Sequence, residues 1–201
     1  WRIEPLAHGR LRVASVMRLN VKKRPQDLVA MVPRIKRQLP SELQPLFTIV
    51  GDGPVRRRLE RQAARLGVAG DIEFRGFLSR EKIREIFAET DVFVLPTEHE
   101  AFGIAVLEAR CAGLPVVARS GCGVADIIEH GRHGYLAHDR RQMADYIAQL
   151  LREADTRRNM RAAAGAGLER FGWDAVIARH LDEYREALAE ASAQRGQRLS
   201  A

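Results

Sequence analysis

The sequence has few of the residues that mark several common protein classes. Two cysteines, Cys111 and Cys122, cannot build a disulfide framework, and the apolar run around Cys111 predicts a small buried side chain. Aromatic residues make up only 6% of the chain, and no basic stripe with interleaved aromatics argues for a nucleic-acid-binding domain. No apolar run reaches the roughly 18 residues of a membrane span and no charged-then-apolar leader is visible, so we expect a soluble, cytoplasmic protein.

Lysine is scarce as well, although the chain is basic. Only four of the 33 basic residues are lysines, and the formal net charge is +7. A basic chain favours anionic partners such as nucleic acid, anionic lipid heads or phosphorylated small molecules. The densest group, RRRLERQAAR at 56–65, places arginines four positions apart, which favours a solvated helix face over a binding surface.

Short β-branched runs alternate with helical patterns along the chain, which predicts an α/β fold. Short connections between them indicate a Rossmann-like, doubly wound parallel sheet that is followed by C-terminal helices. Pro33 should kink or restart the first helix, and Ser79 should cap the helix at 79–90. We predict strands at 11–16, 46–50, 71–77, 91–96, 114–118 and within 131–137, and a helical pattern at 140–188 that is broken near 170–174.

Charged residues gather where these strands should end, at the edge of the sheet that binds ligands in this architecture. If a helix begins just after Gly103, its free N–H groups and positive dipole end favour an anion. Glu100 and Glu108, eight positions apart, could each accept hydrogen bonds from the hydroxyl groups of a sugar or ribose. Arg18 and Lys23 follow the first strand and could hold phosphate. This combination suits a nucleotide-linked sugar, although each residue alone is as easily a surface residue.

Five segments together resemble the C-terminal half of the family 4 retaining glycosyltransferases, which have the GT-B fold. The resemblance runs from about residue 11 to residue 186, and its most specific part is the pair of glutamates with Phe-Gly between them. The segments are VASVMRLNVKKRPQDLV, FTIVGDGPVRRRLE, IEFRGF, DVFVLPTEHEAFGIAVLEARCAGLPVVA and GCGVADIIEHGRHGYLA.

The resemblance implies a role for each matching residue. Arg18 and Lys23 match the basic pair that binds the donor diphosphate, Glu100 matches the carboxylate that contacts the transferred sugar, and Glu108 matches the one that binds the ribose. Met17 departs from the glycine usual in the family. The remaining donor-binding residues implied are Gly51, Gly53, Gly76, Phe77, Leu78, Phe102, Gly103 and Ile104, although GDGP at 51–54 is most simply a strand-to-helix turn.

The resemblance also implies what the chain uses and lacks. Residues 11–190 would form the donor-binding half of a GT-B enzyme, 1–10 the remnant of an interdomain linker, and 191–201 a disordered tail. Because the chain begins at Trp1 and an N-terminal acceptor domain is missing, we expect the fragment to be inactive alone. The apolar positions of the helical segment at 173–188 fit either core packing or contact with that missing domain.

No metal or other cofactor is expected, because no D-x-D pair occurs, and His130, His133 and His138 lack accompanying acidic or cysteine ligands. The expected partners are a UDP-, GDP- or ADP-linked sugar and the enzyme's own N-terminal domain. Nucleic acid is not expected, whereas a peripheral membrane contact of the complete enzyme is. The alternatives are a non-catalytic nucleotide-sugar-binding module and a GT-B relative such as an epimerase.

Overall fold

A computed structural model describes residues 9–199, and strands and helices alternate along it as predicted. The strands are β1 (Arg12–Val16), β2 (Leu46–Val50), β3 (Ile72–Gly76), β4 (Val92–Leu95), β5 (Val116–Arg119) and β6 (Gly134–Ala137). The α-helices are α1 (Pro25–Arg37), α2 (Arg56–Arg65), α3 (Arg80–Ala88), α4 (Ile104–Cys111), α5 (Arg140–Arg152), α6 (Ala154–Ala163) and α7 (Trp173–Leu199). Short 3-10 helices are η1 (Val21–Lys23), η2 (Ala69–Asp71), η3 (Gly123–Asp126) and η4 (Glu169–Phe171).

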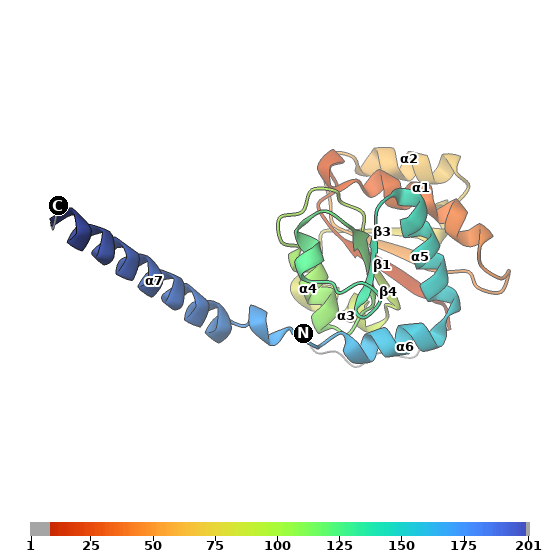
Figure 1. Ribbon diagram of the computed structural model, residues 1–201. Helices are drawn as coiled ribbons and strands as arrows, with labels where there is room; N and C mark the ends of the chain where they lie inside the picture. The colour runs from red at the N-terminus through yellow and green to blue at the C-terminus, as the bar shows by residue number, and fades with distance from the viewer. Residues whose placement is uncertain (1–8, 200–201) are drawn as a thin grey trace. The chain divides into compact units, whose positions relative to one another are not determined.

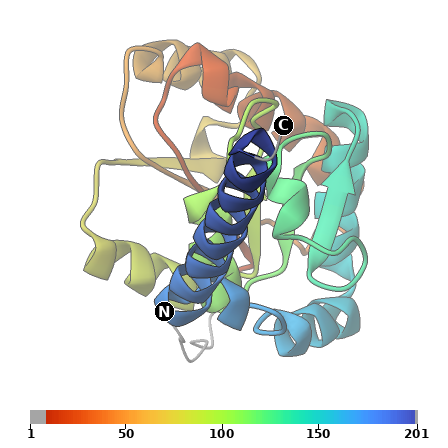
Figure 2. The ribbon, with the colours of Figure 1, turned by 60° about the vertical axis from the view of Figure 1, so that its left-hand side comes forward.

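The six strands form one parallel sheet in the order β3-β2-β1-β4-β5-β6. Helices α1, α2 and α5 lie on one side of the strands, and α3 and α4 lie on the other (Figures 1 and 2). Because both faces are covered, every residue of β2 and of β4 is buried, as are the three middle residues of β1 between them. The predicted Rossmann-like, doubly wound α/β sheet is confirmed.

Helix α1 continues through Pro33, so the helix does not restart there. A proline inside a helix removes one backbone hydrogen bond and costs roughly 3 kcal/mol. Burial of Leu28, Val29, Met31, Val32 and Ile35 along the same helix offsets that cost. The predicted cap of α3 is present, since the Ser79 hydroxyl accepts a hydrogen bond from the Lys82 N–H.

The C-terminal part of the chain forms a unit of its own, and the donor-binding domain predicted at 11–190 stays a prediction. The chain divides into a compact unit that ends at Gly165 and a second unit that begins at Ala166. In the second unit α7 extends to Leu199, so 191–199 is helical rather than disordered, because alanine, glutamine and arginine dominate it.

Two predictions concern a membrane span and an interdomain linker. Across residues 9–199, no helix combines the length and the apolar character that crossing a bilayer requires. The linker predicted at 1–10 falls mostly on residues 1–8, which lie outside the described residues.

The strand order places the switch point of the sheet between β1 and β4. These neighbours pair in parallel, with Val13 opposite Val92 and Ala14 opposite Phe93. Their following loops run to helices on opposite faces, which opens a crevice at the carboxyl ends. The loop after β2 is fastened to the loop after β1: Leu19 N–H donates to the Asp52 carbonyl at 2.9 Å.

Gly51 makes that close approach possible. Its φ is +123°, and a Cβ added there would lie 1.9 Å from the Met17 carbonyl oxygen. We therefore expect Gly51→Ala to lower the free energy of unfolding by roughly 2–4 kcal/mol, through strain and a backbone clash. Urea unfolding would measure the loss. Gly70→Ala is the matched control, because nothing lies within 4 Å of its added Cβ; equal stability of the two variants would contradict this explanation.

Candidate functional site

Two adjoining hollows open at the carboxyl ends of the central strands, and Val16 and Met17 line both. The first, of about 440 Å³, is named here the Arg18 hollow, and the second, of about 400 Å³, the Lys23 hollow. The Met17 side chain is 7% exposed. Met17 therefore stands at the boundary between the hollows, at the position where the family resemblance implies glycine.

The Lys23 hollow holds the closest pair of opposite charges among the predicted site residues. The Lys23 Nζ lies 2.7 Å from the Glu100 Oε2, and the two side chains are 28% and 17% exposed. Asn20 fixes the backbone on one side of this pair, because its side-chain oxygen accepts a hydrogen bond from the Lys23 N–H at 3.0 Å. The structure thus brings two predicted catalytic residues together from the β1–α1 and β4–α4 loops.

The N-terminus of α4 forms the opposite wall of the Lys23 hollow, which Phe102, Gly103 and Ile104 line. Gly103 is the N-cap with φ of +89°, and an added Cβ would lie 3.0 Å from the Val124 side chain. Ile104 is 63% exposed. An anion in the hollow would therefore meet the N-terminal end of the helix dipole and one ammonium group.

The Arg18 hollow is lined by Val50, Gly51, Phe77 and Leu78 beside Arg18. Phe77 is 86% exposed and stands directly after β3. Arg18 thus lines the hollow that holds the segment predicted to meet the nucleobase. The two predicted cations therefore lie in neighbouring hollows and not in one.

Two glycines predicted to bind the donor have their N–H groups occupied within the protein. The Gly51 N–H donates to the Gly76 carbonyl at 2.7 Å, and the Gly53 N–H donates to the Asp52 carboxylate at 2.7 Å. A Cβ on Gly53 would lie 2.2 Å from the Leu19 carbonyl oxygen. The structure gives these glycines a packing role: they let the loops after β1, β2 and β3 approach one another.

Glu108 lies one turn into α4, and its carboxylate is 3.8 Å from the guanidinium of Arg80. The Glu108 side chain is only 16% exposed, whereas Arg80 is 76% exposed. Burial raises the pKa of Glu108, and Arg80 partly opposes that rise. A poorly compensated carboxylate costs stability, and a hydroxyl-bearing ligand could supply the hydrogen bonds that it lacks.

Comparison with known proteins places this geometry in a family. The family model "Glycosyl transferases group 1" matches residues 2–166. The chain belongs to this family.

Two curated relatives are longer than this chain. A D-inositol 3-phosphate glycosyltransferase of Streptomyces scabiei is 36% identical over 132 residues, which are 65% of this chain and 30% of the relative. A GDP-mannose-dependent alpha-(1-6)-phosphatidylinositol monomannoside mannosyltransferase of Mycobacterium tuberculosis is 29% identical over 205 residues, 92% of this chain and 52% of the relative. The chain thus spans about a third to a half of these relatives.

A solved structure agrees with the fold. The pneumococcal O-GlcNAc transferase GtfA, solved in complex with UDP and GlcNAc, has a TM-score of 0.74 and 26% identity over 93% of this chain and 38% of that protein. The chain is therefore the Rossmann-like C-terminal half of a GT-B fold, as the sequence resemblance implied.

Several residues that shape the site were not identified from the sequence. The Thr97 hydroxyl donates to the Lys22 carbonyl at 3.2 Å, and the Gly123 N–H donates to the Glu100 carbonyl at 2.8 Å. Arg24 and Glu98 form a second ion pair between the same two loops at 3.1 Å. In the sequence, the opposite charges of Arg24 and Glu98 after the strands β1 and β4 were the feature that could have indicated this ion pair.

The histidines do not form a cluster. His130 lies against Tyr135, and His138 Nδ1 is 2.9 Å from the Ser120 hydroxyl. His133 is buried at 6% exposure, and its Nδ1 accepts a hydrogen bond from the Glu129 N–H. Within the described part of the chain, no group of three or more His, Cys, Asp or Glu residues is arranged to hold a metal.

The raised pKa of Glu108 predicts how stability depends on pH. A carboxyl group whose pKa is higher in the folded than in the unfolded protein favours folding while it is protonated, and this contribution is lost as pH rises through the folded pKa. Glu108→Gln should therefore gain stability over the wild type as pH rises from about 4 to 7, measured by urea unfolding. Glu85→Gln, at an exposed position of α3, is the control. A gain that shrinks with rising pH would contradict the assignment.

Proposed function

We propose that this chain is the donor-binding half of a retaining, metal-independent glycosyltransferase that takes a sugar from a nucleoside-diphosphate sugar. The observation that carries the proposal is the contact of Lys23 with Glu100 at the N-terminus of α4. This contact places an ammonium group, a carboxylate that can bind sugar hydroxyls and the first backbone amides of α4 in one hollow of a family member. No isolated group among these would suffice for the assignment.

The diphosphate is the leaving group, so negative charge grows on it as its bond to the sugar breaks. Lys23 has three ammonium protons, of which Glu100 engages one, so the others are available to phosphate oxygens. The first amides of α4 add their dipole, and Arg18 approaches from the neighbouring hollow. Preorganised charge of this kind is usually the largest single contribution to catalysis.

The two glutamates take the hydroxyl groups of the donor. Glu100 holds the transferred sugar in the Lys23 hollow, and Glu108 holds the ribose near the start of α3. The nucleobase lies against Phe77 and Leu78 in the Arg18 hollow. The transferred sugar and the nucleobase thus occupy the Lys23 hollow and the Arg18 hollow, which meet at Met17.

The complete enzyme would contain an N-terminal acceptor domain, so the isolated chain should bind donor without transferring sugar. Sugar transfer or hydrolysis by the purified chain would contradict this. UDP and GDP are the first nucleotides to test, because GtfA was solved with UDP and the mycobacterial relative is GDP-mannose-dependent. Cytoplasmic location and a peripheral membrane contact of the complete enzyme stay predictions, which fractionation of cells that express it would test.

The central test is a calorimetric titration of the 201-residue chain with UDP-, GDP- and ADP-sugars and, separately, with duplex DNA. We expect one nucleotide sugar to bind, with or without EDTA, and Lys23→Ala to weaken its binding at least about tenfold, or 1.4 kcal/mol. Lys22→Ala is the matched control, because it removes the same charge from an exposed neighbour. Equal losses in both variants, a strict need for Mg²⁺, or binding of DNA alone would contradict the proposal.

A further inference from the structure

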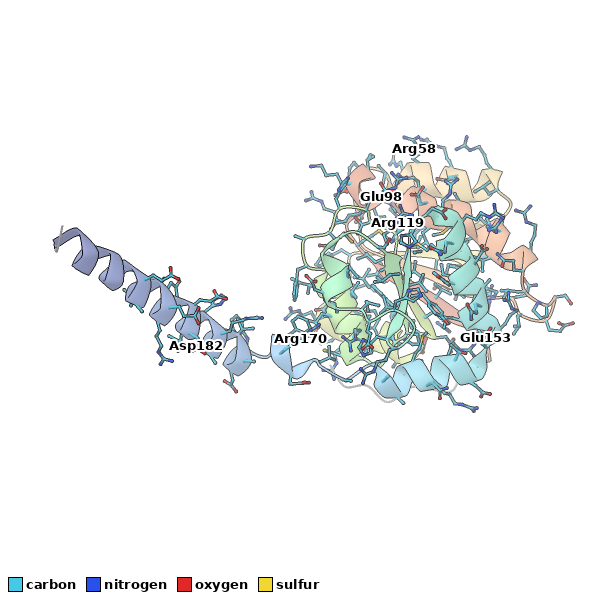
Figure 3. The ribbon with its side chains drawn as sticks, viewed as in Figure 1. Arg58, Glu98, Arg119, Glu153, Arg170 and Asp182 are labelled. Atoms are coloured by element: carbon cyan, nitrogen blue, oxygen red, sulfur yellow. The ribbon has the colours of Figure 1, made fainter. Side chains whose placement is uncertain are left out.

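A chain of alternating charges lies beside the Lys23 hollow, at the ends of β1, β4, β5 and β6. Glu98 lies at its centre: its Oε2 is 3.1 Å from Arg24 Nη1, and its Oε1 is 3.3 Å from Arg119 Nη2. Figure 3 shows Glu98 and Arg119 close together. Arg24 Nε also lies 2.6 Å from Asp27, which in turn lies 3.5 Å from Arg140. Five charged side chains, from two loops, β5, α1 and α5, are thus linked one to the next.

The backbone of Arg24 adds an independent observation. Its φ is +53° and its ψ is +40°, and it is the single non-glycine residue with positive φ in the described part of the chain. L-residues other than glycine, asparagine and aspartate rarely adopt this left-handed conformation, because Cβ comes too close to the backbone. Glycine would fit here without strain, so the arginine is retained at a conformational cost that its side-chain contacts must offset.

This charged cluster surrounds a hollow of about 290 Å³, but it does not suit a second anion. Three guanidinium groups, of Arg24, Arg119 and Arg140, face three carboxylates, of Asp27, Glu98 and Asp139. The charges balance, and each arginine is paired with at least one of these carboxylates. The three carboxylates neutralise the three guanidinium groups, so the hollow offers an incoming phosphate little net attraction. The arrangement is suited to holding loops together.

The contacts between the two site loops follow one another along the chain. The Lys22 carbonyl accepts from Thr97, the Lys23 ammonium pairs with Glu100, and the Arg24 guanidinium pairs with Glu98. Three successive residues of the β1–α1 loop are therefore each bonded to the β4–α4 loop. Of these contacts, the one made by Lys23 is the one that a donor diphosphate would disturb.

We propose that Arg24, Glu98 and Arg119 are positioning residues that hold Lys23 and Glu100 at the spacing the donor requires. The inference rests on the proposed function of that pair. When phosphate draws the ammonium away from Glu100, the bond between Arg24 and Glu98 keeps the loops from separating, and Arg119 fastens Glu98 to the end of β5. Preorganisation of this kind lowers the ordering cost of binding.

The sharpest variant is Arg24→Gly, because glycine accepts φ of +53° and so removes the side chain without straining the loop. We expect Arg24→Gly and Glu98→Gln to weaken nucleotide-sugar binding about tenfold and binding of the nucleoside diphosphate alone about threefold or less. A purely structural role would weaken both ligands equally. The double variant should bind about as weakly as either single variant, because the two residues act through one contact.

The matched control is Arg34→Gln, which breaks a bidentate pair between α1 and Asp145 of α5 at 3.0 and 3.1 Å. It should change the urea midpoint while leaving affinity for both ligands unchanged. Arg24→Lys should restore part of the affinity that Arg24→Gly loses. It returns the positive charge but not the planar guanidinium that can bond two carboxylates at once.

Amide hydrogen exchange separates failure of the positioning role from failure of the proposed function. Without ligand, exchange of residues 98–103 should quicken in Arg24→Gly and Glu98→Gln and stay at the wild-type rate in Arg34→Gln. The positioning role would be overturned if exchange in Arg24→Gly and Glu98→Gln stayed at the wild-type rate. It would also be overturned if these variants kept the wild-type ratio of affinities for the nucleotide sugar and the nucleoside diphosphate. If the wild type bound no nucleotide sugar while exchange still quickened, the proposed function would fail and the fastening of the loop would stand.

Discussion

The parallel pairing of β1 with β4 is the constraint on which the site depends. It brings Lys23 and Glu100, 77 positions apart in sequence, to within 2.7 Å of each other. Parallel strands that are neighbours in space but not in sequence leave a crevice at their carboxyl ends, because the chains leave them in opposite directions. The charged residues of this chain occupy that crevice, where the helix dipole of α4 adds to the ammonium group. The place of the candidate site thus follows from strand order before any single residue is considered.

Several residues around this crevice have conformations or environments that lower the stability of the folded protein. Glu108 is buried with only an exposed arginine to compensate it, and Arg24 adopts a conformation that favours glycine. Gly51 leaves no room for any side chain, so the loops after β1 and β2 are tolerant of few substitutions. Strained or poorly compensated groups cluster at functional sites because the surrounding structure holds them there. The packed sheet, with β2 and β4 wholly buried, supplies that support.

Hydrophobic periodicity predicted the sheet and most helices, because buried parallel strands and amphipathic helices leave distinct patterns. It did not predict that α1 continues through Pro33, since burial over the whole helix decides that outcome. The resemblance identified Lys23 and Glu100, but no sequence pattern could show that Arg18 lines a separate hollow. The opposite charges of Arg24 and Glu98 were visible at the ends of β1 and β4, but which side chains pair across the loops depends on three-dimensional register.

Co-crystallisation of the chain with UDP, or with whichever nucleotide binds, tests the central claim most directly. The account predicts diphosphate density between the Lys23 ammonium and the first amides of α4, with the base against Phe77. Well-ordered nucleotide elsewhere on the protein, with the bond between Lys23 and Glu100 undisturbed, would contradict it.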